Sequence, residues 1–298
     1  MPEQLHFTVP ADYDQKQAKL FLKGYCGLST RMITSLKRET EGIVSNGKIL
    51  RTVDTVRAGQ LVTITLPEEE SPYIEPTEGE LAVVFEDSHL LIADKPPFMP
   101  VHPVKQYQTD TLANRVAAYS LSRGERYVFR AVNRLDRNTS GLVMIAKDRF
   151  TVNRLKNRVH KTYLAAVHGE MTQDGTVSAP IGLHEDSKIV RHVAAEGAPA
   201  VTHYAVIYSN KEYSLLRLWL ETGKTHQIRC HMSHLGHPLL GDDLYGGTRE
   251  KINRHALHCA EMRFRHPVTG EDITVQAALP QDMALLFVAA GRSIQECS

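Results

Sequence analysis

The sequence predicts an α+β protein: a small α/β unit at the N-terminus, followed by a larger region built on a mixed, largely antiparallel central sheet. Two observations support this prediction. From residue 81 onward, strand-like segments outnumber helical patterns, which favours a largely antiparallel sheet over a doubly wound one. Residues 67–80 contain three prolines and six glutamates, a composition typical of a linker. The expected organisation is therefore a first domain over residues 1–66, an acidic, proline-rich linker over residues 67–80, and a second domain over residues 81–298.

The first domain has clear local signals for helix ends and turns. Ser29 is placed to cap a helix, Gly24 to end the helix before it, and Asn46-Gly47 is a type I′ hairpin signal. The expected elements, in chain order, are helices over residues 15–23 and 30–38 and strands over residues 43–45, 48–50 and 61–66.

The second domain consists mainly of expected strands. They cover residues 81–85, 89–93, 161–167, 176–180, 201–208, 213–220, 258–264 and 273–277. Helices are expected over residues 111–120, 149–158 and 281–290.

The composition is that of an ordinary globular protein, with 42% hydrophobic and 23% charged residues in 298. The first residues lack the basic and apolar regions of a secretory signal, and the longest apolar stretch, residues 284–290, is far too short to span a membrane. Four cysteines occur without a Cys-x-x-Cys pair, so reduced thiols are expected. We therefore expect a cytoplasmic, monomeric protein without a membrane partner.

The charge is unevenly distributed, although the net value is only +1. Residues 1–66 carry +3, residues 67–90 carry −8 and residues 91–298 carry +6. Residues 123–161 alone carry +8. Five arginines of this segment are expected to crowd around a single acid, Asp136: Arg123, Arg126, Arg130, Arg134 and Arg137. A basic surface of this kind suits a nucleic-acid partner, and the acidic linker is expected to face away from it.

Residues 133–147 form the most informative stretch. Asp136 lies between Arg134 and Arg137, and a polar turn then leads through Gly141 into an apolar strand-like run. Nearby positive charge favours the ionised carboxylate, so Asp136 suits the role of nucleophile or electrostatic stabiliser better than that of general acid. Taken by itself, Arg-x-Asp-Arg also fits a simple ion pair on a loop.

The whole string, Asn-Arg-Leu-Asp-Arg-Asn-Thr-Ser-Gly, resembles the signature loop of the RluA-type pseudouridine synthases, in which the Asp is catalytic. Four further segments match the same family in the same order: residues 94–103 (Asp-Lys-Pro-Pro-Phe-Met-Pro-Val-His-Pro), 161–165 (Lys-Thr-Tyr-Leu-Ala), 223–242 (from Gly-Lys-Thr-His-Gln-Ile-Arg-Cys-His to Gly-His-Pro-Leu-Leu-Gly-Asp) and 257–267 (Leu-His-Cys-Ala-Glu-Met-Arg-Phe-Arg-His-Pro). The resemblance implies the pseudouridine synthase fold for the second domain. One departure is Asn133, where the family commonly has His, and this change bears on how the loop contacts the substrate backbone.

The resemblance also implies a reaction and a set of residues. Uridine in RNA, ribosomal or alternatively transfer RNA, would be isomerised to pseudouridine without a cofactor. Asp136 would act as nucleophile or as the base that removes a sugar proton. Tyr163 would pack against the uracil and assist removal of its C5 proton, while Arg229 would pair with Asp136. The expected substrate-binding residues are Arg134, Arg137, Thr139, Ile228 and Leu142, of which Arg134 would fill the space left by the extruded base.

The first domain resembles the α-L RNA-binding domain of a small-subunit ribosomal protein and of many RNA-modifying enzymes. The match rests on Gly-Leu-Ser-Thr-Arg (27–31) and Val-Ser-Asn-Gly-Lys (44–48). Expected RNA contacts are Arg31, Lys37, Arg38, Lys48 and Arg51. A packing or dimerisation module is the alternative.

Histidines and cysteines cluster late in the chain, at His226, Cys230, His231, His234, His237, His255, His258 and Cys259. They could bind zinc, but no zinc signature is present, so no metal is expected. Two other classes of function stay open: an RNA-binding or ribosome-assembly factor without catalysis, and a metal-dependent hydrolase.

Overall fold

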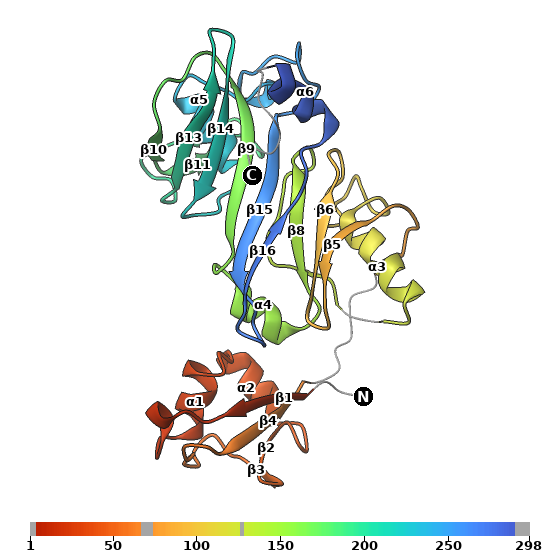
Figure 1. The fold of residues 1–298 in the computed structure, drawn as a ribbon, viewed down its shortest axis with the longest axis vertical. Helices are drawn as coiled ribbons and strands as arrows, with labels where there is room; N and C mark the ends of the chain where they lie inside the picture. Colours follow the sequence, from red (N-terminus) through yellow and green to blue (C-terminus); the bar gives the residue numbers. More distant parts are fainter. Residues whose placement is uncertain (1–3, 67–73, 126–127, 290–298) are drawn as a thin grey trace.

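The computed structural model describes residues 4–66, 74–125 and 128–289. Figure 1 shows a smaller N-terminal unit lying against one end of a larger unit, at the end where helix α4 (Arg149–Leu155) is found. The larger unit is a twisted mixed sheet with few helices, which confirms the predicted α+β class. Arg126 and the first half of the predicted linker, residues 67–73, lie outside the described residues.

The smaller unit is a four-stranded antiparallel sheet with two helices. Its elements are β1 (Gln4–Thr8), the 3-10 turn η1 (Ala11–Tyr13), α1 (Ala18–Gly24), α2 (Thr30–Leu36), β2 (Ile43–Ser45), β3 (Lys48–Ile49) and β4 (Leu61–Thr65), and the strand order is β1-β4-β2-β3. Ser29 caps α2 by accepting a 3.1 Å hydrogen bond from the Met32 N–H. Asn46 and Gly47 have φ of 50° and 73° in the β2–β3 turn, so the hairpin prediction is confirmed.

In this unit the sequence missed one strand and misplaced the start of one helix. Strand β1 was not predicted, because five residues without a flanking turn signal do not reveal that β4, more than fifty residues later, pairs with them. The first helix begins at Ala18 rather than at Gln15, because Gln15 adopts a left-handed backbone conformation (φ 57°) that no α-helix accommodates.

Phe150 joins the two units. It belongs to α4 of the larger unit, yet its side chain is 1% exposed within the core of the smaller one. Its ring lies 5.9 Å from that of Phe7, measured between centroids. One turn further along α4, Arg154 Nη1 donates hydrogen bonds to the carbonyls of Tyr25 (3.0 Å) and Cys26 (2.8 Å). The smaller unit is therefore docked through specific contacts.

The larger unit has ten strands in one sheet. In chain order its first elements are β5 (Ala82–Glu86), β6 (Leu90–Lys95), α3 (Leu112–Ser122), β7 (Arg130–Ala131), β8 (Ser140–Ala146), α4, β9 (His160–His168) and β10 (Gly175–Ser178). The later ones are β11 (Ile181–Leu183), β12 (Arg191–Val193), β13 (Val201–Ser209), β14 (Tyr213–Leu220), α5 (Gln227–His234), the 3-10 turn η2 (Asp243–Tyr245), β15 (Leu257–Arg265), β16 (Asp272–Gln276) and α6 (Gln281–Ala289). The strand order is β10-β13-β14-β9-β15-β8-β6-β5, with β16 beside β15 and β7 beside β8, while β11 and β12 form a separate hairpin. Among the described strands only β8 and β15 run parallel to each other.

The start of β8 positions the loop that carries Asp136. β8 and β15 pair only through Ser140–His258 and Gly141–Cys259, after which β15 pairs with β16 instead. Gly141 has φ of 108°, and a Cβ at this position would collide with the backbone of Cys259. Glycine is therefore required where the loop enters the strand, as the sequence predicted.

Several elements of the larger unit were missed. β7, β11 and β12 are only two or three residues long, too short for a periodic signal. Helix α5 was not among the expected elements. The described end of the linker is attached to α3 by two hydrogen bonds of Asn114. Its side-chain Nδ2 donates to the Glu75 carbonyl (2.7 Å), and its backbone carbonyl accepts from the Thr77 N–H (3.2 Å).

Candidate active site

The loop between β7 and β8 carries Asp136 and is held on both sides. Within it, the Thr139 N–H donates to the Asp136 carbonyl (3.1 Å), and Thr139 Oγ1 forms a 2.7 Å hydrogen bond with His255 Nε2. Asn133 binds β8 through two backbone groups, the Leu142 carbonyl (3.2 Å) and the Met144 N–H (2.9 Å). Asn133 therefore anchors the loop to the sheet, and its side chain is engaged by protein rather than free for the substrate backbone.

Two buried basic side chains support the back of this loop. Lys95 at the end of β6 is fully buried, and its Nζ donates to the carbonyls of Pro96 (2.8 Å) and Arg137 (3.3 Å). Burial, reinforced by Arg254, lowers the pKa of Lys95 to about 7. Arg254 Nη1 donates to the Asn138 carbonyl (3.1 Å). Neither side chain was predicted to support the loop, because a Lys-Pro pair and an isolated arginine in the sequence give no such signal.

Arg229 provides the partner of Asp136. It lies on α5, and its Nη1 donates to Asp136 Oδ2 at 3.0 Å. Two further 2.7 Å hydrogen bonds, from Nε and Nη2, join it to both oxygens of Asp242, whose side chain is 1% exposed. Burial lowers the pKa of Arg229, but the bonds to Asp242 and Asp136 outweigh this and raise it above its usual value. A permanent positive charge is thus fixed against Asp136, and Asp242 sets its orientation.

A small cavity of about 70 Å³ opens over this pair. Its lining consists of Arg134, Leu135, Asp136, Thr139, Tyr163, Leu220, Lys224, His226, Gln227, Ile228, Arg229 and Leu257. Ligand pockets usually measure about 300–1,000 Å³, so a nucleotide would enter only if exposed rim side chains move. Arg134 and Lys224 are the exposed cations at this rim.

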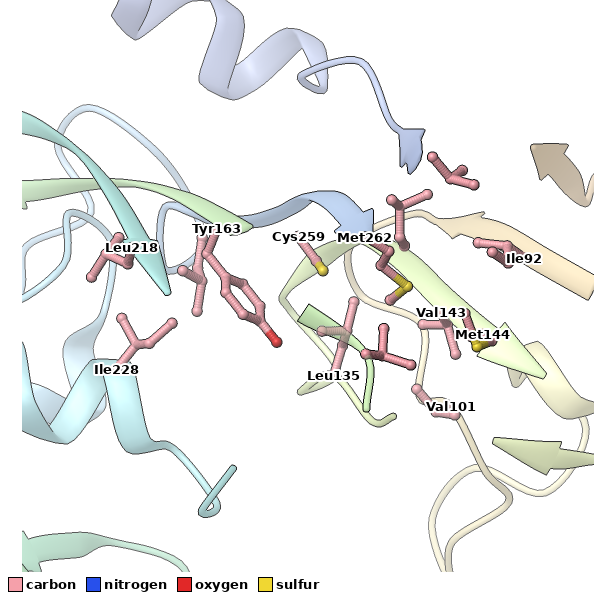
Figure 2. Packing of buried hydrophobic residues seen from close by; sticks show 14 of the residues in the cluster. Ile92, Val101, Leu135, Val143, Met144, Tyr163, Leu218, Ile228, Cys259 and Met262 are labelled. Atoms are coloured by element: carbon pink, nitrogen blue, oxygen red, sulfur yellow. The ribbon is translucent and has the colours of Figure 1, made fainter. Parts of the chain in front are cut away.

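Tyr163 forms one wall of the cavity from strand β9. Figure 2 shows its ring projecting from the strand, with Leu218 and Ile228 to one side and Leu135 to the other. Burial, together with the hydrogen bond to Cys259, raises the pKa of Tyr163 well above 10. The phenol therefore stays protonated at neutral pH, which suits packing against a ring better than removal of a proton.

Two expectations about the positions of the site residues were wrong. Leu142 is fully buried in the core and does not line the cavity, because every residue of the central strand β8 is buried and an apolar run cannot tell which side faces the site. Leu135, Leu220 and Leu257 provide the apolar wall beside Ile228. Arg137 turns away from Asp136, donating to Tyr107 Oη at 3.0 Å.

The expected crowding of arginines around Asp136 is also absent. Arg123 pairs with Glu125 at 3.7 Å. Arg130 lies on β7, which pairs with the far end of β8, and its Nη1 donates to the Val128 carbonyl (3.0 Å). Of the five arginines expected to crowd around Asp136, Arg134 is the one that lines the cavity within the described residues. Proximity along the chain was the misleading signal, since turns direct neighbouring side chains apart.

The late histidines form separate hydrogen bonds rather than a ligand cluster. His231 binds Thr202 Oγ1 and the Ala179 carbonyl, both at 2.9 Å, and His258 Nδ1 binds Ser140 Oγ at 3.0 Å. In the part of the chain that the structure describes, no three His, Cys, Asp or Glu side chains are arranged to hold a metal ion. None of the described helices is long and apolar enough to cross a membrane.

The fold and site define a class of protein with solved members. The human RNA pseudouridylate synthase domain containing 4 structure matches 70% of this chain and 93% of its own with a TM-score of 0.57, at 23% identity. The human RNA pseudouridylate synthase domain containing 1 structure matches 76% and 98% with a TM-score of 0.54, at 24% identity. These likenesses establish the fold.

Sequence comparison identifies the family. Residues 89–234 match the model of the RNA pseudouridylate synthase family. An uncharacterised RNA pseudouridine synthase of Bacillus subtilis (strain 168), YjbO, is 41% identical over 89% of this chain and 96% of its own length. Ribosomal large subunit pseudouridine synthase D of Escherichia coli (strain K12) is 34% identical over 85% and 84%. The chain belongs to the RNA pseudouridylate synthase family, and it is an isomerase that forms pseudouridine in RNA.

Proposed function

We propose that this enzyme isomerises specific uridines of ribosomal RNA, with Asp136 as its catalytic residue. The observation that carries the proposal is the 3.0 Å contact between Asp136 Oδ2 and Arg229 Nη1 at the floor of the cavity. A carboxylate that accepts a hydrogen bond from a fixed cation is held in one orientation, which both roles considered for it require.

The reaction replaces one bond to the sugar by another. The bond between uracil N1 and C1′ breaks, the base turns, and C5 bonds to C1′. The C5 proton is lost, and N1 ends with a proton. Asp136 acts either by adding to the substrate as a nucleophile or by removing a sugar proton to allow cleavage, and no redox step occurs.

The remaining residues hold the base and exclude water. Tyr163 and Ile228 would pack against the extruded uracil, which costs a few kcal/mol to unstack. Arg134, exposed at the rim, would occupy the vacated stack and contact a phosphate. Thr139 orders the loop rather than the base, since its hydroxyl is already bonded to His255. Arg137 lies beside Tyr107, outside the cavity, where a contact with the RNA backbone is the role open to it.

Ribosomal RNA is favoured as the substrate by the relatives named as ribosomal large subunit pseudouridine synthase D. The N-terminal unit adds an exposed basic surface, for which we propose a role in RNA binding. Arg31, Lys37, Arg38, Lys48 and Arg51 are all exposed, and none of them forms an ion pair within the described residues.

The test combines one substitution with mapping of the target. Asp136→Asn should reduce pseudouridine formation by at least about a thousand-fold while leaving folding and RNA affinity unchanged. Asp243→Asn is the matched control, because that carboxylate is exposed and its ion-pair partner among the described residues is the exposed Arg249. Pseudouridine mapping of ribosomal and transfer RNA from cells with and without the gene identifies the substrate. Loss of a site in transfer RNA alone would reject ribosomal RNA, and an active Asp136→Asn enzyme would reject the catalytic assignment.

A further inference from the structure

His226 has an unusual backbone conformation beside Asp136. It is the N-cap of α5 with φ of 57° and ψ of 20°, in the left-handed region, and its side chain does not cap the helix. N-cap residues normally adopt extended backbone angles and bond to the helix N–H groups. A left-handed L-residue costs about 1–2 kcal/mol, and such strain persists mainly where surrounding contacts enforce it, often at active sites. The strained backbone here directs the imidazole into the cavity instead of toward the helix.

A hydrogen-bonded chain determines which nitrogen of His226 carries the proton. The Arg191 N–H donates to Tyr245 Oη at 2.9 Å, and Tyr245 Oη lies 3.0 Å from His226 Nδ1. Within the described residues, Tyr245 Oη has these two hydrogen-bond partners, and Nδ1 is the one of them that can accept a proton. The hydroxyl therefore donates to Nδ1, and the ring proton lies on Nε2.

The protonated nitrogen of His226, Nε2, faces Asp136. His226 Nε2 lies 3.6 Å from Asp136 Oδ2, the same oxygen that accepts from Arg229 Nη1. Burial lowers the pKa of His226 below 6.5, and Arg229 and Arg191 lower it further against the opposing effect of Asp136 and Asp242. The imidazole is therefore neutral at neutral pH and offers one N–H.

We propose that His226 is a positioning residue for Asp136. Its Nε2–H, oriented by the chain from Arg191 through Tyr245, binds Asp136 Oδ2 together with Arg229 and so turns Oδ1 toward the substrate. The 3.6 Å separation closes to hydrogen-bond length when RNA fills the cavity, since catalytic hydrogen bonds are often long in the free enzyme. This inference rests on the proposed catalytic role of Asp136.

The kinetic test separates positioning from simple structural support. The substrate is in vitro transcribed large-subunit ribosomal RNA, and pseudouridine formation is followed under single- and multiple-turnover conditions. His226→Ala should lower kcat about 10- to 100-fold with little change in KM, as is typical when an orienting partner is lost. His226→Gln, whose amide N–H reaches a position close to that of Nε2, should restore most of that loss.

Tyr245→Phe tests the chain itself. The variant keeps the ring of residue 245, whose centroid lies 4.9 Å from the guanidinium carbon of Arg229, and loses only the hydroxyl. We expect this variant to lower kcat about tenfold in the wild-type background and to have no further effect in His226→Ala. Tyr213→Phe is the matched control, because its hydroxyl bonds to the Leu286 carbonyl (3.2 Å) away from the site and its loss should leave kcat unchanged. Additive effects of the two substitutions would overturn the proposal.

A second measurement does not depend on turnover. Nitrogen NMR of histidine-labelled protein should show His226 as the neutral Nε2–H tautomer, and Tyr245→Phe should convert it to a mixture. A wild-type enzyme inactive on every RNA would reject the proposed function, whereas the tautomer measurement still tests this inference. An Nδ1–H tautomer or a protonated ring at pH 7 would overturn it.

Discussion

Phe150→Ala should release the N-terminal unit from the catalytic unit. Phe150 projects from α4 into the core of the other unit, where it is 1% exposed and packs against Phe7. Truncation of a buried phenylalanine typically costs about 3–5 kcal/mol, because apolar contact is lost and a cavity remains. A factor of ten corresponds to about 1.4 kcal/mol, so the ratio of docked to undocked protein should fall by roughly two to three and a half orders of magnitude.

Hydrogen exchange measured by mass spectrometry is the direct assay. Peptides covering α4, α1 and the segment between α1 and α2 should exchange faster in Phe150→Ala, and the radius of gyration should increase. Phe98→Ala is the matched control, because the same atoms are removed from a side chain that is 49% exposed. Unchanged exchange in these peptides, with a melting temperature like that of the control, would refute the role assigned to Phe150.

Three further predictions concern charge. Burial lowers the pKa of Lys95 to about 7 in the folded protein, whereas its ordinary value is 10.5. The unfolded chain therefore binds one more proton between these pH values, and the free energy of unfolding should rise by up to roughly 5 kcal/mol from pH 7 to 10.5 and fall by the same amount on return to pH 7. Urea unfolding of wild type and Lys95→Met at several pH values should show this rise only in the wild type. Asp242→Asn removes the charge that pairs with the buried Arg229, so it should cost about 3–5 kcal/mol of stability and lower kcat. Urea unfolding and turnover measure the two effects. Unchanged stability and kcat would contradict the role of Asp242 in orienting Arg229. Replacing the five exposed N-terminal cations named above by alanine, one at a time, should flatten the dependence of log RNA affinity on log salt by roughly 0.7–0.9 per lost phosphate contact, and an unchanged slope would favour a purely packing role for the unit.

Point substitutions are the better test of RNA binding by the N-terminal unit. Removing residues 1–66 would expose Phe150 and leave Arg154 without its carbonyl partners. The resulting loss of stability would be mixed with any loss of RNA affinity. The unit packs on α4 and also presents exposed basic side chains, so packing and the proposed RNA binding are compatible roles.

Features set by a few neighbouring residues were predictable from the sequence. Ser29 caps α2 because its hydroxyl reaches an N–H three residues later, and Asn46-Gly47 turns because both residues tolerate positive φ. The family match rests on contiguous strings, so it led to Asp136, Tyr163 and Arg229 together. These residues do line one cavity, although their chemical roles stay predictions.

The partners of each side chain were decided only by the tertiary structure. Asp136 is paired by Arg229, which is 93 positions away, while its neighbour Arg137 points to Tyr107. Lys95 supports the loop from another strand, and Phe150 completes the core of a different unit. A strand that is buried on both faces has no alternation to read, which is why Leu142 was misplaced. Periodicity and turn chemistry act over a few residues, whereas buried charges and apolar surfaces are satisfied by whichever groups the fold brings near, however distant they are in the chain.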